Sequence, residues 1–309
     1  MKALLLACLL APSPAAASAF AELAALAAPG ETTPAGAGRF RREPARVVLR
    51  GAPPDGRPAA VLIHGLLGSP EEMSAIAARL ERSHQVYFLE FPDLRVEPSA
   101  NGAALAARLA QLRAAAGDGR PLLIVAHSLG GFVARAALNE MTASGELARW
   151  GAVRAVCVDT PWHGIVGPGW RLPLPGALDE LHARGPLLRA GFLSEPVAPN
   201  ASIELVFAAE GIAAKDYTER ALRDLPEALA RHFSGGEPVR GSPRLMNFWR
   251  ALQASSQYPA FSSRLRAEAA ARPLDAAAVL AALHAHFPRL PGRHGAVLSS
   301  PELLDAIAP

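Results

Sequence analysis

The first half of the chain alternates between two hydrophobic patterns. Four short and almost wholly apolar runs have the length and composition of strands covered on both faces. They cover 60–65, 85–91, 122–127 and 152–160. Between them, apolar residues recur at helical spacing over 69–80, 104–116 and 130–141. Strands that alternate with helices of this length predict a parallel sheet with helices on both faces, which is an α/β fold.

The helix expected over 69–80 carries a start signal. Ser69 can cap its first turn, Pro70 suits the first helical position, and Glu72 completes a capping box with Ser69. After Thr160 the regular alternation ends, and one further strand is visible at 202–207. The stretches 161–201 and 212–290 are mostly helical and too long for ordinary connections. We expect them to be helical insertions that cover the end of the sheet as a cap or lid.

The N-terminal residues resemble an export signal. Lys2 precedes an apolar stretch over 3–11 that is too short to span a bilayer, and Ala19 and Ala21 are small enough for a signal-peptidase site. We therefore predict a signal peptide over 1–21, a linker or N-terminal arm over 22–45, and a folded domain over 46–309. The expected location is the periplasm or the exterior. An alternative is a lipid anchor, since 5–8 faintly resembles a lipoprotein cleavage site at Cys8.

Composition narrows the function classes. Half of the 309 residues are hydrophobic and the formal net charge is only +3, so a large core is expected and a nucleic-acid groove is not. The two cysteines, Cys8 and Cys157, permit neither a disulfide framework nor a cysteine zinc site, and Cys157 lies in an apolar run typical of a buried thiol. Without a carboxylate cluster in the sequence, we expect no metal and no cofactor.

Polar residues end the third apolar run at a position suited to catalysis. Ala126-His127-Ser128-Leu129-Gly130 matches small-x-Ser-x-small, the nucleophile elbow between a strand and a helix. Small residues are needed there because strand and helix approach closely, and the N–H of Leu129 would then face a developing oxyanion. The alternative is that Ser128 only caps the helix.

The loop after the first of these strands is the second part of the predicted site. His64-Gly65-Leu66 ends that strand about 60 residues before Ser128. Because the carboxyl ends of parallel strands meet at one edge of a sheet, the N–H of Leu66 is the natural second oxyanion donor. We expect His64 to support the loop rather than to react.

Three stretches together carry a family resemblance. They are VLIHGLLGSP, IVAHSLGGFVAR and VDTPWHGI, within 61–165, and a fourth stretch at 293–307 extends it. They resemble the α/β-hydrolase fold and, within it, the bacterial lipases and esterases. The resemblance implies a mostly parallel central sheet with helices on both faces and helical cap or lid insertions. It also implies acyl-ester hydrolysis by a serine, an acid and a histidine.

The resemblance guides the choice of the base. In this fold the histidine comes late in the chain, and His294 stands in a loop like that of the family's catalytic histidine. His284 and His286 lie in a helical pattern and are expected to be structural. The strand that the family places before this histidine is not visible in the sequence at 287–292, where prolines and a glycine stand instead.

The acid is less certain from sequence. The family usually places an aspartate just past the strand at 202–207, and the matching position here is Glu210. We take Glu210 as the expected acid. Asp159, at the end of the preceding strand, is the alternative because some lipases place their acid there, and Asp216 is a further candidate.

The resulting hypothesis is a carboxylic ester hydrolase that forms an acyl-enzyme on Ser128 with His294 as general base. The substrate expected is a small-molecule or lipid ester, with contact to lipid surfaces, no nucleic acid and no evident protein partner. One alternative is an acyltransferase, thioesterase or amidase that uses the same triad. Another is a non-catalytic hydrolase-like binding module, which the atypical acid position and the missing strand favour.

Overall fold

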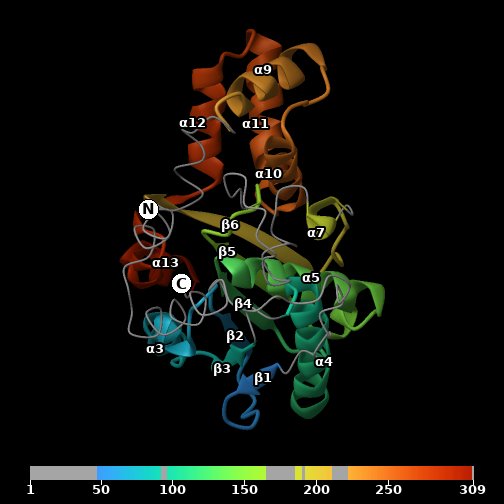
Figure 1. Ribbon diagram of the computed structural model, residues 1–309, viewed down its shortest axis with the longest axis vertical. Helices are drawn as coiled ribbons and strands as arrows, with labels where there is room; N and C mark the ends of the chain where they lie inside the picture. The colour runs from blue at the N-terminus through green and yellow to red at the C-terminus, as the bar shows by residue number, and fades with distance from the viewer. Residues whose placement is uncertain (1–46, 92–95, 165–184, 190–191, 211–221, 308–309) are drawn as a thin grey trace, which may run out of the picture.

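The computed structural model describes residues 47–91, 96–164, 185–189, 192–210 and 222–307 (Figure 1). The predicted signal peptide (1–21) and linker (22–45) lie outside these residues. A seven-stranded sheet forms the centre of the fold. Its strands are β1 (Val48–Arg50), β2 (Ala59–Ile63), β3 (Gln85–Glu90), β4 (Leu122–His127), β5 (Val153–Val158), β6 (Ala201–Glu210) and β7 (Arg289–Arg293). They lie in the order β1-β3-β2-β4-β5-β6-β7, and all neighbours are parallel except β1 and β3.

The helices fall into three groups. Those against the sheet are α3 (Ser74–Leu80), α4 (Pro98–Ala116), α5 (Leu129–Ala143) and α13 (Pro301–Ile307), with the short helices η1 (Pro70–Met73), η2 (Leu147–Arg149) and η3 (Ala296–Ser299). Another short helix, α7 (Pro186–Arg189), lies between β5 and β6. A separate group beyond β6 consists of α9 (Leu225–Gly235), α10 (Pro243–Ala254), α11 (Tyr258–Ala271) and α12 (Ala276–His286) (Figure 1).

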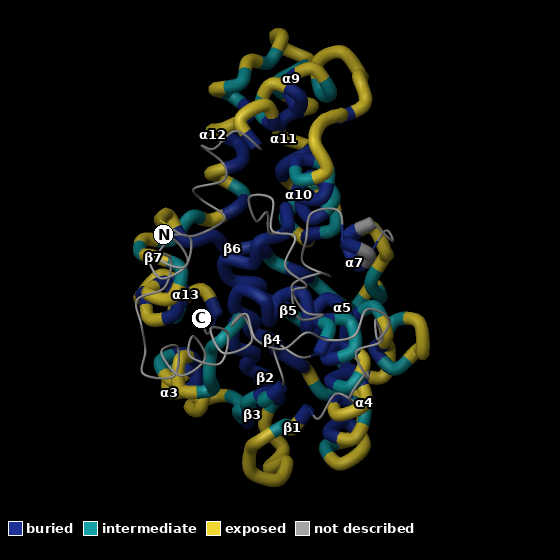
Figure 2. The backbone as a smooth tube through the Cα atoms, in the orientation of Figure 1, coloured by how far each residue is buried: buried dark blue, intermediate teal, exposed yellow. Residues whose placement is uncertain are grey.

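Alternate residues of each strand supply the two faces of the sheet, as expected for a sheet covered on both sides. Val61 and Ile124 pack with α4 and α5, whereas their neighbours Leu62 and Val125 pack with α3, η3 and α13. Figure 2 shows burial concentrated on the central strands and on the helix surfaces that face them. Because β2 and β4 are buried on both faces, their sequences are continuous apolar runs rather than alternating ones.

The helices α4 and α5 pack closely because one position in α4 has no side chain. A Cβ built on Gly102 would overlap the Cβ of Ala136 and lie 2.9 Å from the backbone nitrogen of Ala137. The position of α5 matters for the site, since this helix begins directly after Ser128.

The helical group beyond β6 is joined to the sheet along the part of the β6 edge that β7 does not pair with. The side chain of Gln257, at the start of α11, accepts from the N–H of Leu205 at 2.8 Å and donates to its carbonyl oxygen at 3.0 Å. The N–H of Ser256 donates to the carbonyl of Ile203 at 2.8 Å. These bonds satisfy the part of β6 that β7 does not reach, and so protect an edge that would otherwise remain open.

Two local expectations were wrong. The strand missing from the sequence reading is present as β7, parallel to β6, although it contains Pro291 and a glycine, Gly292, at φ +110°. As an edge strand it tolerates residues that a central strand would not. The capping box at Ser69 is also absent: the chain forms the 3-10 helix η1 first, and the Ser69 side chain makes no cap hydrogen bond.

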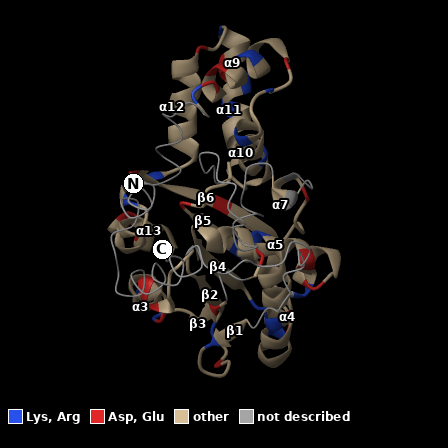
Figure 3. Ribbon diagram, viewed as in Figure 1, with Lys and Arg blue, Asp and Glu red and all other residues tan. Residues whose placement is uncertain are grey.

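Ribbon positions of Lys and Arg alternate with those of Asp and Glu over the described elements, without a continuous basic stripe in the view of Figure 3. Within the described ranges, none of the helices has both the length and the apolar character needed to span a membrane.

Substitution Gly102→Val tests the close packing of α4 on α5. We expect it to lower the free energy of unfolding by about 2–3 kcal/mol, because the new side chain must displace the backbone and Ala136 of α5. Ala107→Val, on the exposed face of the same helix, is the control and should cost less than about 1 kcal/mol. Urea denaturation followed by circular dichroism measures both, and equal midpoints would contradict the account.

Candidate active site

Ser128 stands on a strained turn between β4 and α5. Its φ is +53° and its ψ is −121°, a conformation that non-glycine residues rarely adopt. Its N–H still donates to the carbonyl of Val158 in β5 at 2.9 Å, so the turn is locked to the end of the sheet. The structure therefore has the backbone geometry that the sequence predicted for a nucleophile elbow.

Glycines allow this turn to fit. A Cβ on Gly130 would lie 2.6 Å from the carbonyl oxygen of His64 and 2.7 Å from that of Ile63, and a Cβ on Gly131 would overlap the side chain of Thr160. Real Cβ atoms do not approach carbonyl oxygens so closely. The helix can therefore begin at this point only because both residues lack side chains.

The loop after β2 lies directly against the elbow. A Cβ on Gly65 would be 2.9 Å from the Cβ of Ser128. The next residue is Leu66, and Leu67 after it has a positive φ of +57°. Leu129, the other predicted oxyanion donor, is the first residue of α5, and the first N–H groups of a helix have no intrahelical acceptor. Both predicted donors thus belong to backbone segments that adjoin Ser128.

Asp159 and His294 meet beside this turn. The Nδ1 of His294 donates to Oδ2 of Asp159 at 2.5 Å, and the Asp159 side chain is completely buried. The other carboxylate oxygen, Oδ1, accepts from the N–H of Ala208 at 3.2 Å. Asp159 directly follows β5 with φ +48°, a third strained position at the carboxyl ends of the strands. A buried carboxylate that holds Nδ1 leaves Nε2 of the imidazole available for proton transfer.

Glu210, the expected acid, is not beside the histidine ring in this structure. It lies at the end of β6 and pairs with Arg293 at 3.6 Å, and the two side chains are 67% and 84% exposed. The structure places the alternative, Asp159, against His294 instead. Asp216 lies outside the described residues.

The other histidines have separate environments. His64 stacks on Phe91 at 4.5 Å and donates from Nδ1 to the carbonyl of Gly65 at 2.8 Å, as expected for a residue that supports the loop. The side chain of His127 bonds the backbone carbonyl of His294. His284 and His286 lie in α12, where His284 contacts Arg289 and His286 packs against the ring of Phe261.

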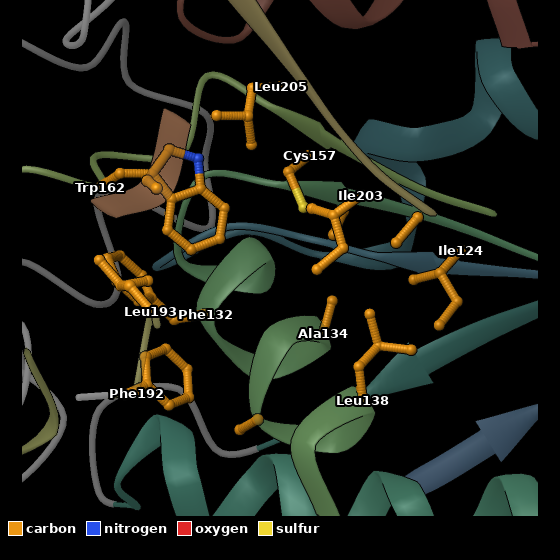
Figure 4. Close-up of a cluster of buried hydrophobic side chains, with 14 of the residues drawn as sticks. Ile124, Phe132, Ala134, Leu138, Cys157, Trp162, Phe192, Leu193, Ile203 and Leu205 are labelled. Carbon is orange, nitrogen blue, oxygen red and sulfur yellow. The ribbon is translucent and has the colours of Figure 1, made fainter. Parts of the chain in front are cut away.

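The thiol of Cys157 is not a competing nucleophile. Burial raises the pKa of Cys157 to about 12, so the thiolate population at neutral pH is negligible. Its side chain belongs to an apolar cluster that also contains Trp162, Phe132 and Phe192 (Figure 4). The Phe132 and Trp162 rings are 5.1 Å apart, and Trp162 follows Asp159 by three residues. In the described ranges, no group of three or more His, Cys, Asp or Glu side chains is arranged to hold a metal ion.

Comparison with protein families identifies one matching model. It is described as "Putative serine esterase (DUF676)" and matches residues 58–171, which include both predicted oxyanion segments, Ser128 and Asp159. The sheet order, the antiparallel edge strand and the elbow after β4 agree with this match. The chain has the α/β-hydrolase fold. The family match together with the elbow further supports a serine hydrolase.

The solved structures that are similar to this chain share little of its sequence. The lipase BlEst2 of Bacillus licheniformis in its mature form is 19% identical, with 53% of this chain and 72% of that chain covered, at a TM-score of 0.40. Its propeptide form covers 53% of this chain and 39% of that chain, at 19% identity and a TM-score of 0.41. A Listeria innocua protein, the product of the gene lin2722, covers 81% and 92% at 11% identity and a TM-score of 0.40. No curated protein sequence matches the chain. We draw no conclusion about substrate from likenesses at this level.

Proposed function

We propose that the chain is a serine hydrolase that cleaves carboxylic esters through an acyl-enzyme on Ser128, with His294 as general base and Asp159 as the acid. The observation that carries the proposal is the hydrogen bond between His294 Nδ1 and buried Asp159, at the sheet edge where Ser128 stands on its strained turn. A strained non-glycine residue persists only where its surroundings enforce it, and such residues gather at active sites.

The proposed reaction uses each group at a stated atom. Nε2 of His294 takes the proton from Oγ of Ser128 as the oxygen attacks the ester carbonyl carbon. The N–H groups of Leu66 and Leu129 stabilise the negative charge that develops on the carbonyl oxygen. His294 then returns the proton to the departing alcohol, and water cleaves the acyl-enzyme by the same sequence of proton transfers.

Asp159 suits its proposed role better than Glu210 for electrostatic reasons. A completely buried carboxylate stabilises the imidazolium in a medium of low polarity, where charge interactions are strong. The exposed Glu210 is screened by water and already has a cation, Arg293, as its partner. The alternative of a non-catalytic module was favoured by the atypical acid position and by the missing strand. The contact of Asp159 with His294, and the presence of strand β7 before His294, argue against that alternative.

The apolar surroundings support an acyl substrate. Leu66 packs against the large hydrophobic cluster, Leu129 is buried, and the rings of Trp162 and Phe132 pack on each other within that cluster. An apolar setting raises the strength of the oxyanion hydrogen bonds and favours contact with hydrocarbon. We accordingly propose a small-molecule or lipid ester of a carboxylic acid as the substrate.

A fluorophosphonate probe tests the nucleophile. We expect stoichiometric covalent labelling of the folded protein, with the mass increment on the peptide that contains Ser128, because only an activated serine attacks such a probe rapidly. Ser128→Ala should abolish labelling, while Ser144→Ala, at an exposed serine beyond α5, should label like the unmodified protein. Unmodified protein that stays unlabelled under these conditions would contradict the proposed function.

Kinetics with p-nitrophenyl esters of increasing chain length test the acid. Asp159→Asn should lower kcat by about 10³- to 10⁴-fold, since the histidine loses both its orientation and the counter-charge for its cation. Glu210→Gln should keep kcat within about threefold of the unmodified enzyme, because that carboxylate is exposed and pairs with Arg293. The reverse ranking of the two variants would assign the acid to Glu210.

A further inference from the structure

His127 links the nucleophile turn to the loop that carries the base. It is the last residue of β4 and only 4% exposed. Its Nε2 lies 2.9 Å from the backbone carbonyl oxygen of His294, so this ring nitrogen donates the hydrogen bond. Its Nδ1 is buried and has no hydrogen-bond partner among the described residues. Among the described residues, the His127 side chain therefore makes one hydrogen bond, to the carbonyl oxygen of His294.

The ring of His127 is wedged between two loops of the site. Its centroid is 4.4 Å from that of the His294 ring, at an interplanar angle of 40°. On the other side, a Cβ on Gly65 would come within 3.1 Å of its Nδ1. The absence of a side chain at Gly65 thus makes room for His127 as well as for Ser128.

We propose that His127 is a positioning residue, which rests on the proposed function: its Nε2–H holds the backbone carbonyl of His294 and so fixes the imidazole where it can exchange a proton with Ser128. Asp159 holds the ring of His294 through Nδ1, and His127 holds the backbone of the same residue. Two attachments define the ring's orientation better than one, and misplacement by about 1 Å can reduce a rate 100-fold.

The loop around His294 needs such an attachment. Gly292 on one side has φ +110°, and Gly295 follows directly on the other. Glycine has the greatest backbone freedom of any residue, so the segment from Gly292, near the end of β7, to Gly295 gains much from a fixed hydrogen bond.

A histidine at this position also stays uncharged beside a residue that becomes a cation. Burial, and then the adjacent His294 and His64, lower the pKa of His127 to about 3. The Nε2–H donor therefore persists at every working pH without adding a positive charge next to the His294 imidazolium. A lysine or arginine would supply a donor but would oppose that charge.

Two substitutions separate the effect of the His127 hydrogen bond from the effect of the volume that the His127 side chain fills. His127→Met fills similar space without a donor and should lower kcat and the rate of fluorophosphonate labelling together by about 10- to 100-fold, with KM within about twofold. His127→Gln retains an N–H donor at similar reach and should restore kcat to within about threefold of the unmodified protein. Thr142→Val, which removes a side-chain bond to the carbonyl of Leu138 farther along α5, should leave kcat unchanged.

The same variants can also contradict the positioning role of His127. If His127→Met keeps its kcat, or if His127→Gln is as slow as His127→Met, the positioning role is overturned. A purely structural role would lower the melting temperature and the yield of folded protein in both His127 variants, without a selective loss of kcat.

Two measurements that need no turnover keep this inference distinct from the proposed function. Long-range ¹H–¹⁵N spectra of histidine-labelled protein should show His127 as the Nε2–H tautomer, assigned by its loss in His127→Gln. Hydrogen exchange over 289–300 should accelerate in His127→Met and not in His127→Gln. An Nδ1–H tautomer, or exchange unaffected by His127→Met, overturns the inference, whereas missing ester turnover with both results positive overturns the proposed function alone.

Discussion

The close approach of helix α5 to the ends of strands β2 and β5 is the constraint on which the site depends. Ser128 can stand at positive φ only while glycines on both sides let the backbones touch. Gly130 meets the carbonyl oxygens at the end of β2, Gly131 meets Thr160 beyond β5, and Gly65 meets Ser128 itself. Each strained position costs about 1–3 kcal/mol, which the buried sheet and helices must offset. The strained turn at Ser128 is thus held by the packing of the sheet and of α5.

All the groups of the proposed mechanism lie at the carboxyl ends of the parallel strands. In the described parts of the chain, the non-glycine residues with positive φ are Leu67, Ser128 and Asp159, and each follows a different parallel strand. Parallel strands bring their carboxyl ends together, so three loops distant in sequence meet there. His294 arrives from a fourth loop after β7 and is attached at two points, its ring to Asp159 and its backbone to His127.

Local sequence patterns predicted the parts of the fold that local physics determines. The apolar runs and the small residues around Ser128 allowed the sheet, its covering helices and the strained elbow to be predicted before the structure. Local patterns could not decide between Glu210 and Asp159 as the acid. That choice depends on which carboxylate faces the ring of His294, which is 135 residues from Asp159 in the sequence. Strand β7 was missed because an edge strand can contain a proline and a glycine that resemble a loop. The contact of His127 with the His294 carbonyl is a tertiary feature that no sequence spacing reveals.

The most direct test is a crystal structure of the protein after reaction with a small phosphonate ester, a mimic of the tetrahedral intermediate. The account predicts phosphorus bonded to Oγ of Ser128, with the phosphonyl oxygen within about 3 Å of the N–H groups of Leu66 and Leu129. His294 should remain bonded to Asp159. An adduct on another residue, or a phosphonyl oxygen directed away from both N–H groups, would contradict the account.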